Sequence, residues 1–328
     1  APEVRSVSVR VGGARLETDN LPAQVSDPSQ VGYSITADSL DEVISRSGAY
    51  LAWTHAQAND SVSGTDARAA QGRPVLPAVP ADWSLLAAGQ GGRQIAAISK
   101  DRTSVRRWLN GTDVTVPDLG NQLVRPAFDS SGWLWVAGRT SSASPSSQAS
   151  RSKRTGDTSS AALWALDTTS TSPTRTPTAL DVPWLGASSV TSLSVSPEGS
   201  RVALTIRDRD DARAVVAAVE RDERGRPVSL GPAHDIAPGV HDVKDVVWAD
   251  GTSLAVLGTS DGLLQPTLVP LDDAPVPLGG VTGASSLVST LDGRSGLFVR
   301  TDANTVFTRQ GSSWSSFLTR GDLIAPRS

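Results

Sequence analysis

The stretch SLSVSPEGSRVALTI, residues 192–206, decides the fold. Its first half alternates apolar and polar residues, as a half-buried strand does. A polar turn with Gly199 at the eighth place follows, and a second apolar run completes the pattern. Two such runs joined by a short turn that contains glycine predict a β-hairpin.

The same pattern occurs six times along the chain. Aligned on the glycine, the other five copies read DEVISRSGAYLAWTH, SLLAAGQGGRQIAAI, RPAFDSSGWLWVAGR, KDVVWADGTSLAVLG and SLVSTLDGRSGLFVR. The marker glycines are Gly48, Gly91, Gly132, Gly199, Gly251 and Gly293. Three of the five spacings between them are close to 42 residues, a period typical of repeat architectures.

Further strand-like sequence follows each hairpin, for example residues 104–109 and 113–116. Four short strands in about 40 residues make one blade of a propeller. We therefore predict an all-β fold, a β-propeller of six blades with four antiparallel strands each. A parallel β-helix is the structural alternative, but its coils are shorter than this repeat and have no hairpin turn at a fixed place.

Two departures from the regular period suggest the domain boundaries. Residues 1–35 contain an alternating segment before the first copy, and we predict strands or a linker that end a preceding domain or close the ring. Residues 36–328 are predicted to form the propeller. Within it, residues 140–160 are a Ser/Thr tract whose composition cannot bury a core, which predicts a mobile insertion.

Composition narrows the classes of function. The chain of 328 residues has 30 Lys and Arg against 34 Asp and Glu and no run of five like charges, so we expect no nucleic-acid partner. Without cysteine it has no disulfide, thiolate nucleophile or thiolate metal site. It has no apolar run of about 18 residues, the length that spans a bilayer. It opens on Ala1 without a signal-peptide pattern, so we expect a mature or trimmed product.

Two short motifs resemble enzyme signatures and fail in context. Residues 258–262, GTSDG, match the nucleophile elbow G-x-S-x-G, which needs a helix after the serine. Pro266 and Pro270 are incompatible with that helix, so a hairpin turn is favoured. The run GQGGRQ from Gly89 fails the dinucleotide pattern because Gln94 stands at its last glycine.

Two further segments invite a metal interpretation. In residues 208–211, DRDD, an EF-hand loop would need glycine and glutamate where Arg213 and Val219 stand, so a solvated loop with Arg–Asp pairing is favoured. His234 and His241 would need at least one more ligand to hold zinc, and none is evident. We therefore expect no metal, no cofactor and no catalytic residues.

Residues 119–139, LGNQLVRPAFDSSGWLWVAGR, combine a PxxD turn with a Gly-Trp-x-Trp strand. Together with the repeats, this passage resembles the actinobacterial LpqB lipoprotein family, and the opening EVRSVSVRVGGARLE resembles the stretch that joins the family's GerMN-type domain to its propeller. The resemblance implies an extracytoplasmic lipoprotein held at the cell membrane by a lipidated cysteine. It also implies a protein partner, the extracellular domain of an Mtr-type sensor histidine kinase of a two-component system.

Propeller geometry suggests where a partner binds. Loops from an outer strand to the next inner strand, and loops from the second to the third strand, emerge on the same face. We predict that this face binds a protein, with Trp184 as aromatic anchor and with Arg139 and Arg207 as charged contacts. The further predicted contacts are Leu185, Asp208, His241, Asp242, Lys100 and Arg102.

The leading interpretation is thus a non-enzymatic protein-interaction domain. The alternative is a propeller hydrolase, or a sugar- or metal-binding enzyme, that uses carboxylates in the central channel. Paired acid-base catalysis would require two such carboxylates in one cleft. A structural spacer for a neighbouring domain is a third possibility.

Overall fold

The hairpin that decides the fold forms at the expected place. In the computed structural model, β14 (Ser189–Val195) and β15 (Arg201–Asp208) pair antiparallel, and Gly199 in the turn has a φ of 75°, which glycine adopts without strain. β16 (Asp211–Arg221) and β17 (Pro227–Leu230) extend this sheet outwards, and β18 (His234–Asp235) also pairs with β16. One copy of the repeat therefore builds one sheet, whose first four strands follow chain order.

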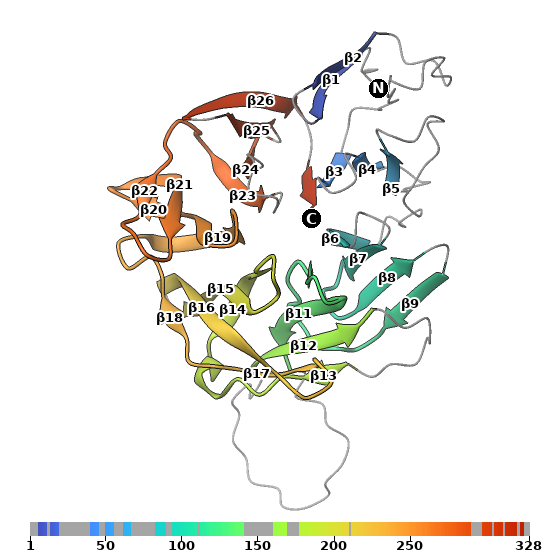
Figure 1. Cartoon of the computed structure of the whole chain (residues 1–328), viewed down its shortest axis with the longest axis vertical. Coiled ribbons are helices and arrows are strands. Elements are labelled where there is room, and N and C mark those ends of the chain that lie inside the picture. Colours follow the sequence, from blue (N-terminus) through green and yellow to red (C-terminus); the bar gives the residue numbers. More distant parts are fainter. Residues whose placement is uncertain are drawn as a thin grey trace, which may run out of the picture.

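Other copies of the repeat build the same kind of sheet. Within each sheet the strands follow chain order, and the sheets are arranged around a ring (Figure 1). The strands are β6 (Trp83–Gly89), β7 (Gln94–Ser99), β8 (Val105–Leu109) and β9 (Thr112–Val116); β10 (Ala127–Phe128), β11 (Trp133–Arg139), β12 (Ala161–Asp167) and β13 (Thr178–Ala179); β19 (His241–Trp248), β20 (Ser253–Ser260), β21 (Leu263–Pro270) and β22 (Val276–Pro277); and β23 (Ala284–Ser289), β24 (Leu297–Thr301), β25 (Thr305–Gln310) and β26 (Ser313–Thr319). The fold is an all-β propeller.

A further sheet joins the two ends of the chain. β3 (Leu40–Ser45), β4 (Tyr50–His55) and β5 (Val62–Asp66) pair antiparallel, and β27 (Asp322–Ile324) pairs with β3 in parallel. This parallel pair corrects the expectation of purely antiparallel blades. The chain enters β27 from the outer strand β26, as it enters every inner strand, and β3 is itself the first strand of a repeat copy, so both run in one direction.

β27 also contacts β23 and β6, the inner strands of the blades on either side. β1 (Ser6–Val11) and β2 (Ala14–Asp19) pair with each other and with no other described strand. The assignment of residues 1–35 to a linker or a preceding domain stays a prediction.

The structure describes residues 6–11, 14–19, 40–45, 50–55, 62–66, 83–89, 94–109, 112–140, 160–168, 177–209, 211–289, 297–303, 305–310, 312–319 and 322–324. The predicted mobile tract lies outside these residues except for its two ends, Thr140 and Ser160. The N–H of Thr140 donates to the carbonyl of Ser160 over 2.8 Å. Within the described part of the chain, no helix is long and apolar enough to cross a membrane.

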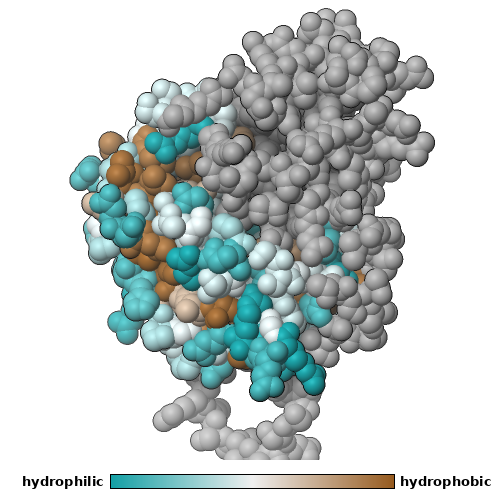
Figure 2. Space-filling view, in the orientation of Figure 1, coloured by the Kyte–Doolittle hydropathy of each residue, from teal (hydrophilic) through white to brown (hydrophobic). Residues whose placement is uncertain are grey.

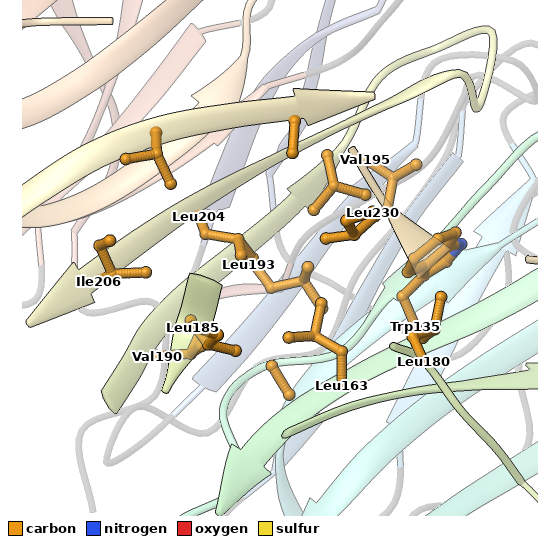
Figure 3. Close-up of a cluster of buried hydrophobic side chains, with 14 of the residues drawn as sticks. Trp135, Leu163, Leu180, Leu185, Val190, Leu193, Val195, Leu204, Ile206 and Leu230 are labelled. Carbon is orange, nitrogen blue, oxygen red and sulfur yellow. The ribbon is translucent and has the colours of Figure 1, made fainter. Parts of the chain in front are cut away.

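The core lies between neighbouring blades. Figure 3 shows one cluster, in which Trp135 and Leu163 of one blade pack against Leu193 and Leu204 of the next. Comparable clusters join the other neighbouring blades from β6 to β26. The tryptophans Trp135, Trp164 and Trp248 belong to such clusters, and Trp108 is also buried.

One buried carboxylate explains the PxxD turn. Asp129 Oδ1 accepts hydrogen bonds from the backbone N–H groups of Ser131 and Trp133, at 2.9 and 2.8 Å. Asp129 Oδ2 accepts from Trp135 Nε1 at 3.1 Å and from Arg221 Nη2 of the next blade at 2.7 Å. The side chain of Asp129 is 0% exposed, so the same group holds its own turn and ties two blades together.

Candidate partner-binding face and central channel

The loops that were expected to share a face lie against one another. The turn after β7 meets the loop after β9, where the N–H of Leu123 donates to the carbonyl of Arg102 over 3.1 Å. At the end of β11, Arg139 exchanges two backbone hydrogen bonds of 2.8 Å with Asn121 of the same loop. The two kinds of loop therefore form one continuous surface, the loop face.

Left-handed backbone recurs on the loop face. Six non-glycine residues with φ between 48° and 58° lie in its loops or beside them, namely Arg102, Asp118, Gln122, Arg209, Asp242 and Asp261. Left-handed backbone costs an ordinary residue about 1–2 kcal/mol, although Asp tolerates it better. Such strain persists only where the surroundings hold it, and it often marks functional loops.

Most of the predicted contact residues are exposed on the loop face. Six of the nine are exposed there: Lys100, Arg102, Arg207, Asp208, His241 and Asp242. Arg139 is half-buried at the end of β11. Asp208 accepts a hydrogen bond from Ser188 Oγ and lies 3.5 Å from Arg213 Nη2 of β16, so its ion-pair partner among the described residues comes from the strand after the loop.

Leu185 and Trp184 differ from the other predicted contacts. Both lie in the short 3₁₀ turn η2 (Pro183–Leu185). Leu185 is 1% exposed and points into the cluster of Figure 3, so the expectation that it contacts a partner is corrected: an apolar loop side chain is buried by the neighbouring blade. Trp184 is half-buried, and its Nε1 donates to the carbonyl of Gly231 over 2.8 Å. Only part of its ring remains for a partner.

A channel of about 220 Å³ lies between the inner strands β6, β10, β14, β19 and β23. Hydroxyl groups are common in its wall, with Ser192 and Ser194 on β14 and Ser286 and Ser289 on β23. The described charged residues that line it are Arg102, Arg125, Lys244 and Asp245. The described wall is therefore mixed, with apolar side chains such as Phe128 and Leu193 beside the hydroxyls, and it carries more positive than negative charge.

Asp245 is held by three donors at the channel wall. Its Oδ1 accepts from Ser192 Oγ and from the N–H of Val246, the latter at 3.0 Å, and its Oδ2 accepts from the N–H of Leu287 at 2.8 Å. Burial raises the pKa of Asp245 above its ordinary value, although Arg125 and the three donors act in the opposite direction. The carboxylate therefore links three consecutive blades and favours its neutral form more than an exposed Asp does.

Comparison with known proteins decides the family. Residues 61–326 match the family described as the lipoprotein LpqB β-propeller domain. The chain belongs to the LpqB β-propeller family. Lipoprotein LpqB of Streptomyces avermitilis is 25% identical over 211 residues, which make up 61% of this chain and 30% of that protein. The match thus spans less than a third of that LpqB protein.

Solved structures share the fold. A β-propeller domain from Myceliophteria thermophila has a TM-score of 0.54 at 14% identity, over 89% of this chain and 90% of that one. A puromycin-hydrolyzing peptidase from Mycobacterium tuberculosis has a TM-score of 0.53 at 16% identity, over 87% of this chain and 48% of the peptidase. At these identities the likeness shows the fold alone, and this LpqB-family chain spans about half of the peptidase.

The enzyme-like motifs of this LpqB-family propeller have structural roles. The elbow-like segment at residues 258–262 is the hairpin between β20 and β21, as expected. A Cβ on Gly258 would lie 2.5 Å from Val240 Cγ1 and 2.9 Å from the carbonyl oxygen of His241, so this glycine allows a loop to pass closely over the strand.

The metal interpretations gain no support from the described residues. His234 and His241 are both exposed and lie in the strands β18 and β19. No group of three or more metal-ligating His, Cys, Asp or Glu side chains occurs in the part of the chain that the structure describes. In the described channel wall of this LpqB-family propeller, Asp245 is the only carboxylate. Acid-base catalysis by two carboxylates would therefore need a second Asp or Glu from outside the described wall.

Sequence reasoning missed the channel residues Arg125, Lys244 and Asp245, although the repeat holds a signal for them. Arg125, Ser192, Lys244 and Ser286 are the first residues of their copies in the alignment. All four line the channel of the LpqB-family propeller. Because a propeller brings equivalent positions to its axis, listing the first residue of each copy would have identified this ring.

Proposed function

We propose that this chain is a non-enzymatic protein-interaction domain of an exported lipoprotein, and that its loop face binds the extracellular domain of a sensor histidine kinase. Membership of the LpqB propeller family supports the lipoprotein role. The observation that carries the proposal is the loop face itself, where six predicted polar contacts are exposed between loops of defined backbone.

The chemistry of the loop face suits a protein better than an apolar ligand. Lys100, Arg102 and Arg207 alternate there with Asp208 and Asp242, and such mixed charges form the polar rim of a protein interface. Complementary charges on a partner would steer association and set its orientation. Trp184 contributes the exposed part of its ring at the edge of this surface.

Architecture and location complete the proposal. Beyond the five blades of antiparallel strands, we propose a sixth blade formed by β3, β4 and β5, since this sheet contacts β6 and β27 stands at its inner edge. In the full-length protein the propeller lies outside the cytoplasm, attached to the cell membrane through a lipid anchor. Kinase modulation then follows from contact between two extracytoplasmic domains.

The test is a binding titration of this 328-residue chain against the extracellular domain of the sensor kinase from the same cell, repeated at several salt concentrations. Saturable binding that weakens with salt is expected, because exposed charges are screened over about 8 Å at physiological ionic strength. Absence of saturable binding at high micromolar concentration contradicts the proposal.

Charge reversal locates the surface. Lys100→Glu and Arg207→Glu on the loop face should each lower affinity several-fold, since a like charge replaces a complementary one. Arg224→Glu, in the exposed turn between β16 and β17, is the matched control and should bind as the wild type does. Equal losses in all three variants would indicate a general effect of net charge and remove the loop face from the proposal.

A further inference from the structure

The channel wall gathers three cations, and within the described residues none of them lies within ion-pair distance of a carboxylate, although Arg125 acts electrostatically on Asp245. The three cations are Arg102, Arg125 and Lys244. Asp245 is the only acid of the described wall and is already engaged by three donors. The described wall therefore carries two uncompensated positive charges when Asp245 is ionised and three when it is neutral.

Three buried polar atoms of the channel residues also lack partners, Trp248 Nε1 among them. Arg125 Nε and Ser286 Oγ have no exposed surface and no hydrogen bond. A buried donor without an acceptor is costly and rare in folded proteins. A guanidinium has only N–H donors to offer, so what Arg125 lacks is an acceptor.

The inner strands place these groups at one level of the channel. β14, β19 and β23 each carry a bulge near their start, and Ser192, Asp245 and Ser286 are the first paired residues after it. Arg125 lies two residues before β10, at the beginning of the neighbouring blade's inner strand. Because inner strands begin at the loop face, these four residues form a layer just inside the mouth of the channel.

We propose that this layer binds a phosphate-class dianion, either inorganic phosphate or the phosphate group of an organic ester. Arg125 and Ser286 lie beside it in the wall, where a change of rotamer brings their unpartnered Nε and Oγ to the anion, and Arg102 and Lys244 neutralise it at the mouth. A phosphate group carries a charge of about −1.5 to −2 at pH 7 and offers three strong acceptor oxygens. A planar guanidinium matches such oxygens with paired N–H donors.

Charge and size both favour a dianion over a single carboxylate. One carboxylate would leave at least one of the three cations uncompensated. The channel of about 220 Å³ exceeds the roughly 30 Å³ of one water several-fold, so a phosphate fits together with ordered water or part of an ester. Burial, which raises the pKa of Asp245, reduces the repulsion between that carboxyl and a bound anion.

The experiment measures binding of inorganic phosphate to the whole chain by calorimetry and by thermal unfolding, with ionic strength held constant by sodium chloride. Glycerol 3-phosphate in a second arm tests an organic ester, and acetate in a third tests a monoanion. A ligand that binds only the folded state raises Tm with concentration. We expect saturable binding of phosphate below about 10 mM, and no comparable binding of acetate.

Variants identify the site. Arg125→Ala and Lys244→Ala should each weaken phosphate binding about tenfold or more, because each removes a charged contact. Ser286→Ala should weaken it less and leaves folding intact, since the hydroxyl it removes makes no hydrogen bond within the chain. Arg224→Ala, an exposed arginine outside the channel, is the matched control and should bind normally.

Each outcome decides the proposal. Binding of both phosphates places the natural ligand among esters, and binding of inorganic phosphate alone assigns the site to the free ion. No saturable binding, equal binding of acetate, or wild-type affinity in Lys244→Ala and Ser286→Ala together would overturn the proposal.

Discussion

Asp129 and Asp245 are enclosed carboxylates that make similar numbers of hydrogen bonds in different surroundings. Asp129 lies between two blades, accepts four hydrogen bonds and forms an ion pair of 2.7 Å with Arg221. Asp245 lies on the channel wall, accepts three hydrogen bonds and has no ion-pair partner among the described residues. Burial raises the pKa of Asp245.

The difference between Asp129 and Asp245 distinguishes a residue that holds two blades together from a residue beside a candidate binding site. The charge of Asp129 is compensated within the fold, so this residue serves the contact between blades. Arg125 acts electrostatically on Asp245 and lines the channel, and its buried Nε has no hydrogen-bond partner. A buried charge that is paired within the fold indicates a structural role. Charges without an ion-pair partner around a cavity indicate a ligand-binding site.

The largest effect is expected from Asp129→Ala. This change leaves the largely buried guanidinium of Arg221 without its partner and the indole N–H of Trp135 without an acceptor, which should lower the free energy of unfolding by about 3–5 kcal/mol. Urea denaturation measures the loss. As a control, Arg226→Ala breaks an exposed pair with Asp222 and should cost at most about 1 kcal/mol. Similar losses in both variants would contradict a cohesive role for Asp129.

A smaller and pH-dependent effect is expected from Asp245→Asn. Because the pKa of Asp245 is raised in the folded state, its contribution to stability is greatest below the ordinary Asp pKa of about 3.9 and falls as pH rises through the raised value. The asparagine variant has no such ionisation. Its destabilisation relative to wild type, on the order of 1–2 kcal/mol at low pH, should therefore shrink towards neutral pH.

Urea denaturation of both proteins between pH 4 and pH 7 measures this trend. A destabilisation that stays constant across the range would show that the pKa of Asp245 is not raised on folding. A destabilisation that grows towards neutral pH would show that the ionised form is the preferred one.

The smallest effect is expected from Ser192→Ala. It removes one of three donors to Asp245 and should lower the free energy of unfolding by about 0.5–1.5 kcal/mol at neutral pH. The lost donor stabilises the ionised carboxylate, so the cost should be lower at pH 4 than at pH 7. In the Asp245→Asn background, the pH dependence of the Ser192→Ala effect should disappear, and its persistence would place its cause elsewhere.

The sequence predicted what is local and repeated. Each hairpin depends on alternation and a turn within 15 residues, and the hairpins of five blades form where the copies stand. β27 has only three residues, and its place beside β3 depends on the closure of a ring, which no local pattern encodes.

The candidate binding site was predicted only in part, because the sequence indicates local features and not contacts between blades. The exposed contacts of the loop face follow from where loops emerge in a propeller. Leu185 was misassigned because its burial depends on side chains of a neighbouring blade, and Arg221 reaches Asp129 across 92 positions of sequence. Arg125 and Lys244 could have been found, since the alignment of the copies places them at its first position.

The central claim, that the loop face binds a protein, is tested most directly by hydrogen exchange of this chain with and without the kinase's extracellular domain. Backbone amides are protected where a partner covers a surface. The account predicts slower exchange in residues 100–104 and 117–123 of the loop face and unchanged exchange in the turn at residues 222–226 between β16 and β17. Protection confined to that turn, or to the outer strands of the blades, would contradict it.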